Sequence, residues 1–128
     1  MMNWEELGFN HVEKTWGCED WLVNTEAYCA KILTVNQNCG GSYHHHKHKN
    51  ETFLCLNGCA WLLLERDDNC IEFHELCVGS SVCIPPGSAH LLIGASSEPC
   101  IILEVSTHHD DEDVVRHWRI DGSAFANL

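Results

Sequence analysis

The feature that most constrains the fold of this chain is a two-residue alternation of side-chain character along short segments. Most of these segments are rich in β-branched or bulky apolar residues and recur at intervals of about 8–12 residues. They are Tyr28–Val35, Ser42–His48, Thr52–Leu56, Ala60–Glu65, Cys70–His74, Ser81–Ile84, His90–Ile93 and Cys100–Ser106. Turn-forming residues such as Asn57-Gly58 separate them. The pattern predicts an all-β sandwich or barrel, with at most one helical turn in residues 3–7 and another in Asp110–Arg116.

The length and charge of the chain narrow its organisation and its partners. Its 128 residues contain no internal repeat and no linker-like stretch, so we expect one domain over residues 1–128. Acidic residues outnumber basic residues by 19 to 7, which gives a net charge of −12. This charge disfavours binding to nucleic acid or to an anionic membrane. An anionic small-molecule ligand would need a local basic pocket.

The lack of a recognisable targeting signal and the spacing of the cysteines lead us to expect a reducing, cytoplasmic environment. The N-terminal residues 1–8 are acidic, and no apolar run approaches the roughly 20 residues of a membrane span. The nine cysteines, an odd number, include no C-x-x-C pair, which disfavours a zinc ribbon or a thioredoxin-type motif. We therefore expect mostly buried free thiols, with a disulfide framework as the less favoured alternative.

Histidines at alternate positions make the segment Ser42–His48 the candidate site. Side chains alternate between the two faces of a strand, so His44, His46 and His48 should share one face. Lys47 and Lys49 should then lie on the outer face, where their charge would discourage pairing between strand edges. Two imidazoles two residues apart are the minimum for a strand to hold one metal ion. His48 lies one step further and is a better candidate for a pocket residue.

A carboxylate and a further histidine complete a possible metal site. Glu51 follows His46 after a short bend, and His90 follows the turn Pro85-Pro86-Gly87, which would direct it inward. Three neutral imidazoles and one carboxylate suit one divalent transition metal, such as Zn, Mn, Fe or Ni. On an octahedral ion they leave two positions for water or a chelating substrate. The alternative is a metal-free barrel whose histidines bind a ligand directly or fill space.

The spacing of these residues resembles the two motifs of the cupin superfamily. Residues 41–58 are similar to G-x5-HxH-x3–4-E-x6-G, and residues 79–94 are similar to G-x5-P-x-G-x2-H-x3-N. Two positions depart: Asn38 stands where the first glycine belongs, and Gly94 replaces the final asparagine. The resemblance implies a jelly-roll barrel of about eight to ten antiparallel strands, and a homodimer. It also implies one metal ion held by His44, His46, Glu51 and His90.

A finer resemblance is to cupins of sugar and sugar-phosphate metabolism, in the style of the type II phosphomannose isomerase domain. In those proteins a Trp-Gly element leads into the barrel, as Trp16-Gly17 does here. A segment of the form E-V-x-T…E-D-x-x-R closes the barrel, as residues 104–116 do here. The resemblance implies a sugar-like small-molecule ligand.

The candidate catalytic residues are Glu104, Glu51 and Arg116. Residues 101, 103 and 105 form the better apolar stripe of the last strand, so Glu104 should enter a polar cavity or face solvent. In a cavity, Glu104 or Glu51 could move a proton on a chelated hydroxy-carbonyl ligand. Alternatively, Glu104 pairs with Arg116. Arg116 could instead clamp a carboxylate or phosphate, or neutralise acidic residues 110–113. The expected pocket residues are His48, Phe53 and Arg116.

Three functions remain open on the sequence. The first is a sugar or sugar-phosphate isomerase or epimerase-like activity in which the metal chelates a hydroxy-carbonyl substrate. The second is an Fe(II)-dependent dioxygenase acting on a small thiol or aromatic acid, which oxygen uptake with iron would identify. The third is a non-enzymatic module that binds a sugar or metabolite without turnover.

Overall fold

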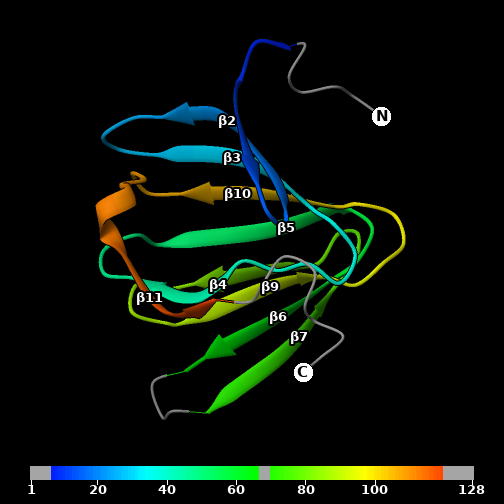
Figure 1. The fold of residues 1–128 in the computed structure, drawn as a ribbon. Helices are drawn as coiled ribbons and strands as arrows, with labels where there is room; N and C mark the ends of the chain where they lie inside the picture. The colour runs from blue at the N-terminus through cyan, green and yellow to red at the C-terminus, as the bar shows by residue number, and fades with distance from the viewer. Residues whose placement is uncertain (1–6, 67–69, 120–128) are drawn as a thin grey trace.

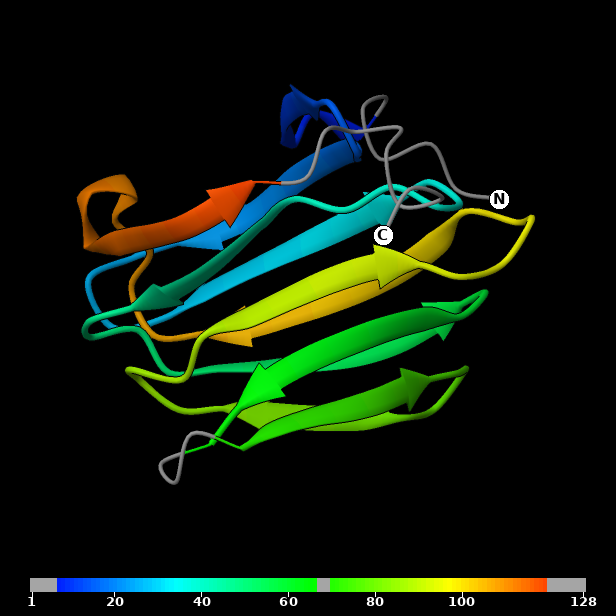
Figure 2. The ribbon, with the colours of Figure 1, turned by 60° about the horizontal axis from the view of Figure 1, so that its bottom comes forward.

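Two antiparallel β-sheets facing each other form the computed structural model, which describes residues 7–66 and 70–119 (Figures 1 and 2). The six-stranded sheet has the order β1-β2-β3-β10-β5-β8, and the five-stranded sheet has the order β11-β4-β9-β6-β7. The described residues contain no α-helix, and the prediction of a small all-β jelly-roll barrel is confirmed. The strands are β1 (Asn10–Lys14), β2 (Gly17–Asn24), β3 (Cys29–Val35), β4 (Ser42–His46), β5 (Glu51–Asn57), β6 (Ala60–Glu65), β7 (Ile71–Leu76), β8 (Ser81–Ile84), β9 (His90–Gly94), β10 (Cys100–Ser106) and β11 (Val114–Arg119).

The strands that the alternation did not mark are β1, β2 and β11. The prediction of a helical turn in Asp110–Arg116 was only partly right, because a 3-10 turn covers just Asp111–Asp113. The Asp110 side chain accepts a hydrogen bond from the Glu112 N–H and so caps this turn. From Val114 onward the chain is extended and pairs with β4, where two β-branched valines favour a strand. The turn expected in residues 3–7 lies almost wholly outside the described residues.

The interior of the barrel is apolar at one end and polar at the other. On β10, Ile102 lies in register with Leu33 of β3 and Cys55 of β5, and these side chains belong to the apolar core. Two residues further along β10, Glu104 lies in register with Lys31 of β3. Because side chains alternate along each strand, the inner face changes from apolar to charged over a single step. The polar half of the barrel is therefore built into the register of the central strands.

The last core strand exposes one end of the face that the sequence suggested was buried. Residues 101, 103 and 105 were expected to be the better core stripe, but only Ile101 is buried, Leu103 is half-buried and Val105 is 50% exposed. Ile102, Glu104 and Ser106 are all buried and point between the sheets. The number of apolar residues on each face did not predict which face is buried, because the inner face borders the apolar core at one end and the polar cavity at the other.

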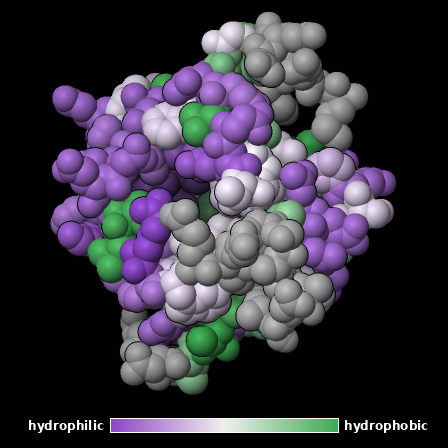
Figure 3. Space-filling view, in the orientation of Figure 1, coloured by the Kyte–Doolittle hydropathy of each residue, from purple (hydrophilic) through white to green (hydrophobic). Residues whose placement is uncertain are grey.

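Hydrophilic residues dominate the described part of the face in Figure 3, with small apolar patches at its left, near its top and near its lower edge.

The cysteines are less buried than expected. Cys29, Cys55 and Cys100 are buried, whereas Cys70 and Cys83 are exposed. The remaining four are partly buried, so the expectation of mostly buried thiols was wrong. Within residues 7–66 and 70–119, no helix is long and apolar enough to cross a membrane.

Candidate metal centre

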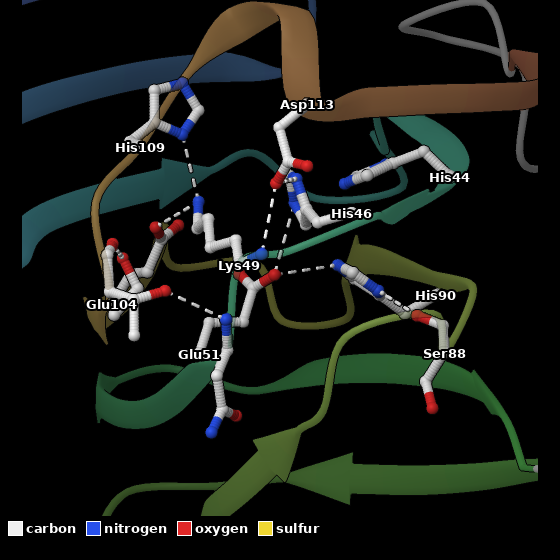
Figure 4. Close-up of polar contacts among 12 residues, drawn as sticks. His44, His46, Lys49, Glu51, Ser88, His90, Glu104, His109 and Asp113 are labelled. Carbon is white, nitrogen blue, oxygen red and sulfur yellow. Dashed lines mark hydrogen bonds and ion pairs between the residues drawn. The ribbon is translucent and has the colours of Figure 1, made fainter.

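Four side chains from three strands meet at the polar end of the barrel (Figure 4). His44 and His46 are two residues apart on β4, and His44 pairs with His90 at the start of β9. The ligand atoms of these three histidines all lie within 4.8 Å of one another. Glu51, the first residue of β5 in the opposite sheet, places its Oε2 atom 3.2 Å from His46 Nε2 and 3.5 Å from His90 Nε2. The structure thus brings together all four residues predicted as metal ligands.

Backbone carbonyls orient two of the three imidazoles. Nδ1 of His90 lies 2.9 Å from the Ser88 carbonyl oxygen, and Nδ1 of His44 lies 2.8 Å from the Ser42 carbonyl oxygen. A carbonyl oxygen can only accept a hydrogen bond, so each Nδ1 carries the proton and donates it. Each Nε2 is then unprotonated and turned toward the centre of the cluster. This arrangement is typical of histidines that bind a metal, because the second nitrogen is held by an outer partner.

The surroundings keep these imidazoles in the form that can bind a metal. Burial, together with the neighbouring His90, lowers the pKa of His44 to about 3. Burial also lowers the pKa of His90, which outweighs the opposing effect of the Glu51 carboxylate. Both rings are therefore neutral near pH 7, and only a neutral imidazole has a lone pair to offer to a metal.

The Glu51 carboxylate is the observation that best tests whether a cation fits. Its Oε2 atom is buried and is one of the few such atoms among the described residues without a hydrogen-bond donor. Burial alone would raise the pKa of Glu51, but the His46 contact and the nearby His90 and Lys49 lower it, so the group is ionised. A buried anionic oxygen that faces the ring nitrogens of His46 and His90 is costly without a positive charge beside it. The donor set therefore fits one divalent transition metal.

Asp113 shapes the bend between the metal-site strands. Its two carboxylate oxygens accept hydrogen bonds from the backbone N–H groups of His48 and Lys49, at 2.9 and 3.1 Å. These bonds lower the pKa of Asp113 despite its burial. Its Oδ2 atom also lies 4.0 Å from His46 Nδ1. Asp113 therefore fixes the turn that follows β4 and lies behind one of the candidate ligands, a role that sequence analysis missed.

Lys49 lies inside the barrel, so its expected position on the outer face was wrong. β4 ends at His46, and the bend that follows breaks the strand alternation on which that expectation rested. Lys49 is only 3% exposed, and its Nζ forms a 2.7 Å ion pair with Oε2 of Glu104. The Glu104 and Glu51 carboxylates raise the pKa of Lys49 although burial opposes this. Glu104 therefore pairs with Lys49 and not with Arg116.

A line of polar contacts connects Glu104 to the surface (Figure 4). The Lys49 ammonium donates to Nδ1 of His109 at 3.0 Å, since a lysine has no acceptor. Nε2 of His109 lies 2.8 Å from Oδ1 of the exposed Asp111 and carries the ring proton. Burial and the charges of Lys31 and Lys49 lower the pKa of His109 to about 4. Burial and the Glu51 charge raise the pKa of Glu104.

The cavity around this cluster concentrates the few cations of the chain. The sequence has seven lysines and arginines in total, and four of them line the cavity. These four are Lys14, Lys31, Lys49 and Arg116. Arg116 reaches the cavity from β11, where it lies in register with His44 and remains exposed. Glu19 and Glu104 line the same cavity and pair with the three lysines. Arg116 forms no ion pair among the described residues and is the lining cation most available to an anionic ligand.

The remaining predicted pocket residues divide between two places. Phe53 is buried in the cavity wall, and its ring lies edge-on to His90 at 6.1 Å. His48 is exposed and borders a separate shallow hollow with Thr107 and His108. It does not share the face of His44 and His46, because the strand ends before it. His109 also lines the cavity, although the sequence pattern did not single it out.

The fold and the interior histidine cluster define a cupin. A family model described as "Mannose-6-phosphate isomerase C-terminal" matches residues 4–119, so the chain belongs to that family. Among curated proteins it is similar to mannose-1-phosphate guanylyltransferase 2 of Escherichia coli O157:H7, with 27% identity over 114 residues. That match covers 88% of this chain and 23% of the relative. The chain spans about a fifth of the length of the curated relatives it matches.

Solved structures show the same fold at low sequence identity. The capsular polysaccharide assembling protein CapF from Staphylococcus aureus superposes with a TM-score of 0.77 at 15% identity, over 86% of this chain and 32% of that chain. Bacillus subtilis oxalate decarboxylase, in a study of its Mn(II) centres, superposes with a TM-score of 0.74 at 17% identity. That match covers 86% of this chain and 30% of that chain.

Proposed function

We propose that this cupin binds one divalent transition metal through His44, His46, Glu51 and His90 and isomerises or epimerises a phosphorylated sugar. The observation that carries the proposal is the buried donor set beside the Lys49–Glu104 pair in a cation-lined cavity. The family description and the relative in mannose phosphate metabolism support a sugar phosphate as the ligand class.

The chain supplies separate groups for binding and for proton movement. A divalent ion held by these four side chains would polarise the carbonyl of a chelating hydroxy-carbonyl ligand. Arg116, at the cavity mouth, binds the phosphate, since a guanidinium matches phosphate oxygens in pairs. Glu104 takes the proton from the carbon beside the carbonyl and returns it to the neighbouring carbon. Burial and the Glu51 charge raise its pKa, which suits a group that must accept and release a proton.

The Lys49 ammonium positions Glu104. Its positive charge also opposes the increase in the Glu104 pKa that burial and Glu51 cause. The contacts Lys49–His109 and His109–Asp111 continue from that pair to the exposed Asp111 side chain. These contacts hold the Lys49 ammonium against Glu104. Because an ammonium cannot accept a proton, Glu104 exchanges its proton directly with the ligand or with water in the cavity. Glu51 contacts His46 and His90, so it serves as a ligand and not as the proton carrier.

The test is solvent deuterium incorporation into mannose 6-phosphate by full-length protein loaded in turn with Mn, Fe, Zn or Ni. We expect deuterium at the carbon beside the carbonyl and interconversion with the ketose phosphate, both followed by NMR. Glu104→Gln should keep full metal content and lose at least about 100-fold in rate, the usual contribution of a general base. The control Glu98→Gln, in an exposed turn, should be unchanged.

Each other outcome contradicts a stated part of the proposal. Tight binding of the sugar phosphate without exchange, with every metal, would identify a binding module and not an isomerase. Oxygen consumption with the iron form would indicate oxygenase chemistry. An unchanged affinity for the sugar phosphate in Arg116→Ala would remove the phosphate-binding role of that residue.

A further inference from the structure

Two cysteines lie close together at the end of the barrel away from the metal centre. Cys59 precedes β6 and Cys77 follows β7, and their Sγ atoms are 3.0 Å apart. His90 pairs with Leu64 near the far end of β6, whereas Ala60, next to Cys59, pairs with Gly94. Neither cysteine lines the cavity of the metal centre. The pair is therefore separate from the proposed active site.

The register of the β6–β7 hairpin brings the two residues face to face. Ala60 lies opposite Leu76, so continuing the ladder by one step places Cys59 opposite Cys77. Directly opposed residues of antiparallel strands have Cα atoms about 4.5–5.5 Å apart, which falls inside the range found for disulfides. Bringing the two sulfur atoms to bonding distance requires a movement of roughly 1 Å. The backbone thus already has a geometry that a disulfide accepts.

Hydrogen bonds from neighbouring turns hold both cysteines in place. The Cys59 N–H donates to Ser96 Oγ at 2.9 Å, and the Ala95 N–H donates to the Cys59 carbonyl at 2.9 Å. The Cys77 N–H donates to Ser80 Oγ at 3.2 Å, and the Ser80 N–H donates to the Cys77 carbonyl at 2.8 Å. Both residues are only partly buried, so a small reagent can reach them. Cys55 and Cys100 are, in contrast, completely shielded.

We propose that Cys59 and Cys77 form an intramolecular disulfide by exchange with a low-molecular-weight disulfide such as glutathione disulfide. The Cys59 thiolate attacks one sulfur of glutathione disulfide, whose S–S bond breaks and releases one glutathione thiolate. Cys77 then loses its proton to solvent, and its sulfur attacks Cys59 and displaces the second glutathione. Two electrons pass from the cysteines to glutathione disulfide, and two molecules of glutathione leave.

The order of attack follows from the surroundings of Cys77. Its Sγ lies 3.6 Å from the Glu75 carboxylate and contacts Cys59 Sγ, and each of these can hold its proton. Contact with Cys59 and burial raise the pKa of Cys77 to about 12. Cys77 is therefore the thiol that reacts second. Once glutathione is attached to Cys59, the short distance between the two sulfur atoms compensates for the high pKa of Cys77.

The experiment treats the full-length protein with glutathione disulfide and maps the products by alkylation and mass spectrometry without reduction. We expect a peptide cross-linked between Cys59 and Cys77 and the loss of both of these thiols, whether or not the exposed Cys70 and Cys83 also form glutathione adducts. Glutathione adducts at Cys59 should accumulate only in Cys77→Ser. Cys83→Ser, which alters an exposed cysteine outside the pair, should leave the cross-link unchanged.

Three results would overturn the proposal, and the wild-type result alone is decisive if a variant fails to fold. The first is a cross-link between any other pair of cysteines. The second is glutathione attached stably to wild-type Cys59 or Cys77. The third is a metal ion bound by Cys59, Cys77 and Glu75, recognised as a second equivalent of metal that Cys59→Ser lacks. None of these readouts depends on sugar-phosphate turnover.

Discussion

His45 offers an internal comparison for the proposed metal ligands. It lies on β4 between His44 and His46, but its ring faces away from the cluster and contacts His117, at 2.8 Å between nitrogen atoms. His45 is therefore a histidine next to His44 and His46 in the chain, but its side chain lies on the opposite face of the strand. A difference in bound metal between a His45 variant and a His46 variant would therefore depend on the interior site and not on the number of histidines.

We predict that His46→Ala or His90→Ala lowers bound metal to well below one equivalent, because each removes one imidazole nitrogen from the cluster. His45→Ala should retain the wild-type content. Elemental analysis of protein purified without a histidine tag makes the measurement. Equal metal content in His90→Ala and His45→Ala would rule out the proposed ligand set.

The Lys49–Glu104 pair should show strong energetic coupling. Both side chains are buried, so Lys49→Met leaves an unpaired carboxylate and should destabilise the protein by roughly 3 kcal/mol. The double variant Lys49→Met/Glu104→Gln should lose less than the sum of the two single variants, since it contains neither unpaired charge. Urea unfolding of all four proteins gives the coupling energy. Simple additivity would show that the two groups do not interact.

Residue spacing predicted the clustering of the four candidate ligands but not the groups around them. Strand alternation predicted that His44 and His46 share one face, and the spacing of the two motifs predicted that Glu51 and His90 lie beside them. Lys49 was misplaced because the strand stops at His46, where Asp113, far along the sequence, holds the bend. His109 was missed for the same reason. Such contacts between distant segments leave no local pattern in a single sequence.

At the scale of elements, the turn after β3 explains one departure from the cupin pattern. Asn38 occupies the position of the expected glycine and has a φ of 60°, the only non-glycine residue with positive φ among those described. Its N–H donates to the Gly94 carbonyl at 2.9 Å, which ties the turn to the end of β9. Asparagine tolerates this left-handed conformation better than other residues with a Cβ atom. The replacement therefore preserves the turn.

We expect Asn38→Gly to be close to neutral and Asn38→Val to destabilise the protein by about 1–2 kcal/mol, since a β-branched residue strains the left-handed conformation. Gln37→Val is the matched control, because Gln37 is its exposed neighbour and does not have a positive φ. Chemical unfolding compares the three. A loss of equal size in Gln37→Val would attribute the effect to surface hydrophobicity.

The first hairpin shows why two strands escaped detection. β1 and β2 carry several charged residues, and their pairing places His11 opposite Asp20. His11 Nδ1 lies 2.6 Å from Asp20, and its Nε2 lies 2.7 Å from Glu13. β1 at the sheet edge and β2 beside it lack the apolar alternation that marks a half-buried strand. Cross-strand polar contacts hold them instead.

For the whole molecule, His11 should make stability depend on pH. Hydrogen bonds to Glu13 and Asp20 raise its pKa to about 9 in the folded protein, against about 6.5 in an unfolded chain. The folded state therefore binds the proton more tightly. Its contribution is complete below about pH 6.5 and disappears as the pH rises toward 9.

His11→Gln should accordingly remove part of the decline in unfolding free energy between neutral pH and pH 9. Urea unfolding of wild type and variant across this interval checks the difference in slope. Parallel curves would mean that His11 has the same proton affinity in both states. Below about pH 6.5 an unfolded chain also protonates His44 and His90, whose pKa values are lowered in the folded protein, so the informative interval lies above it.

The four candidate ligands do not belong to one layer of the barrel. His44, His46 and His90 lie in the five-stranded sheet, and Glu51 begins a strand of the six-stranded sheet. An ion shared by these side chains is consequently a non-covalent cross-link between the two halves of the sandwich. The same ion would both activate a ligand and set how far the sheets can slide past each other. The width of the cavity mouth, and hence which ligands enter, would then vary with the radius of the ion that the protein carries.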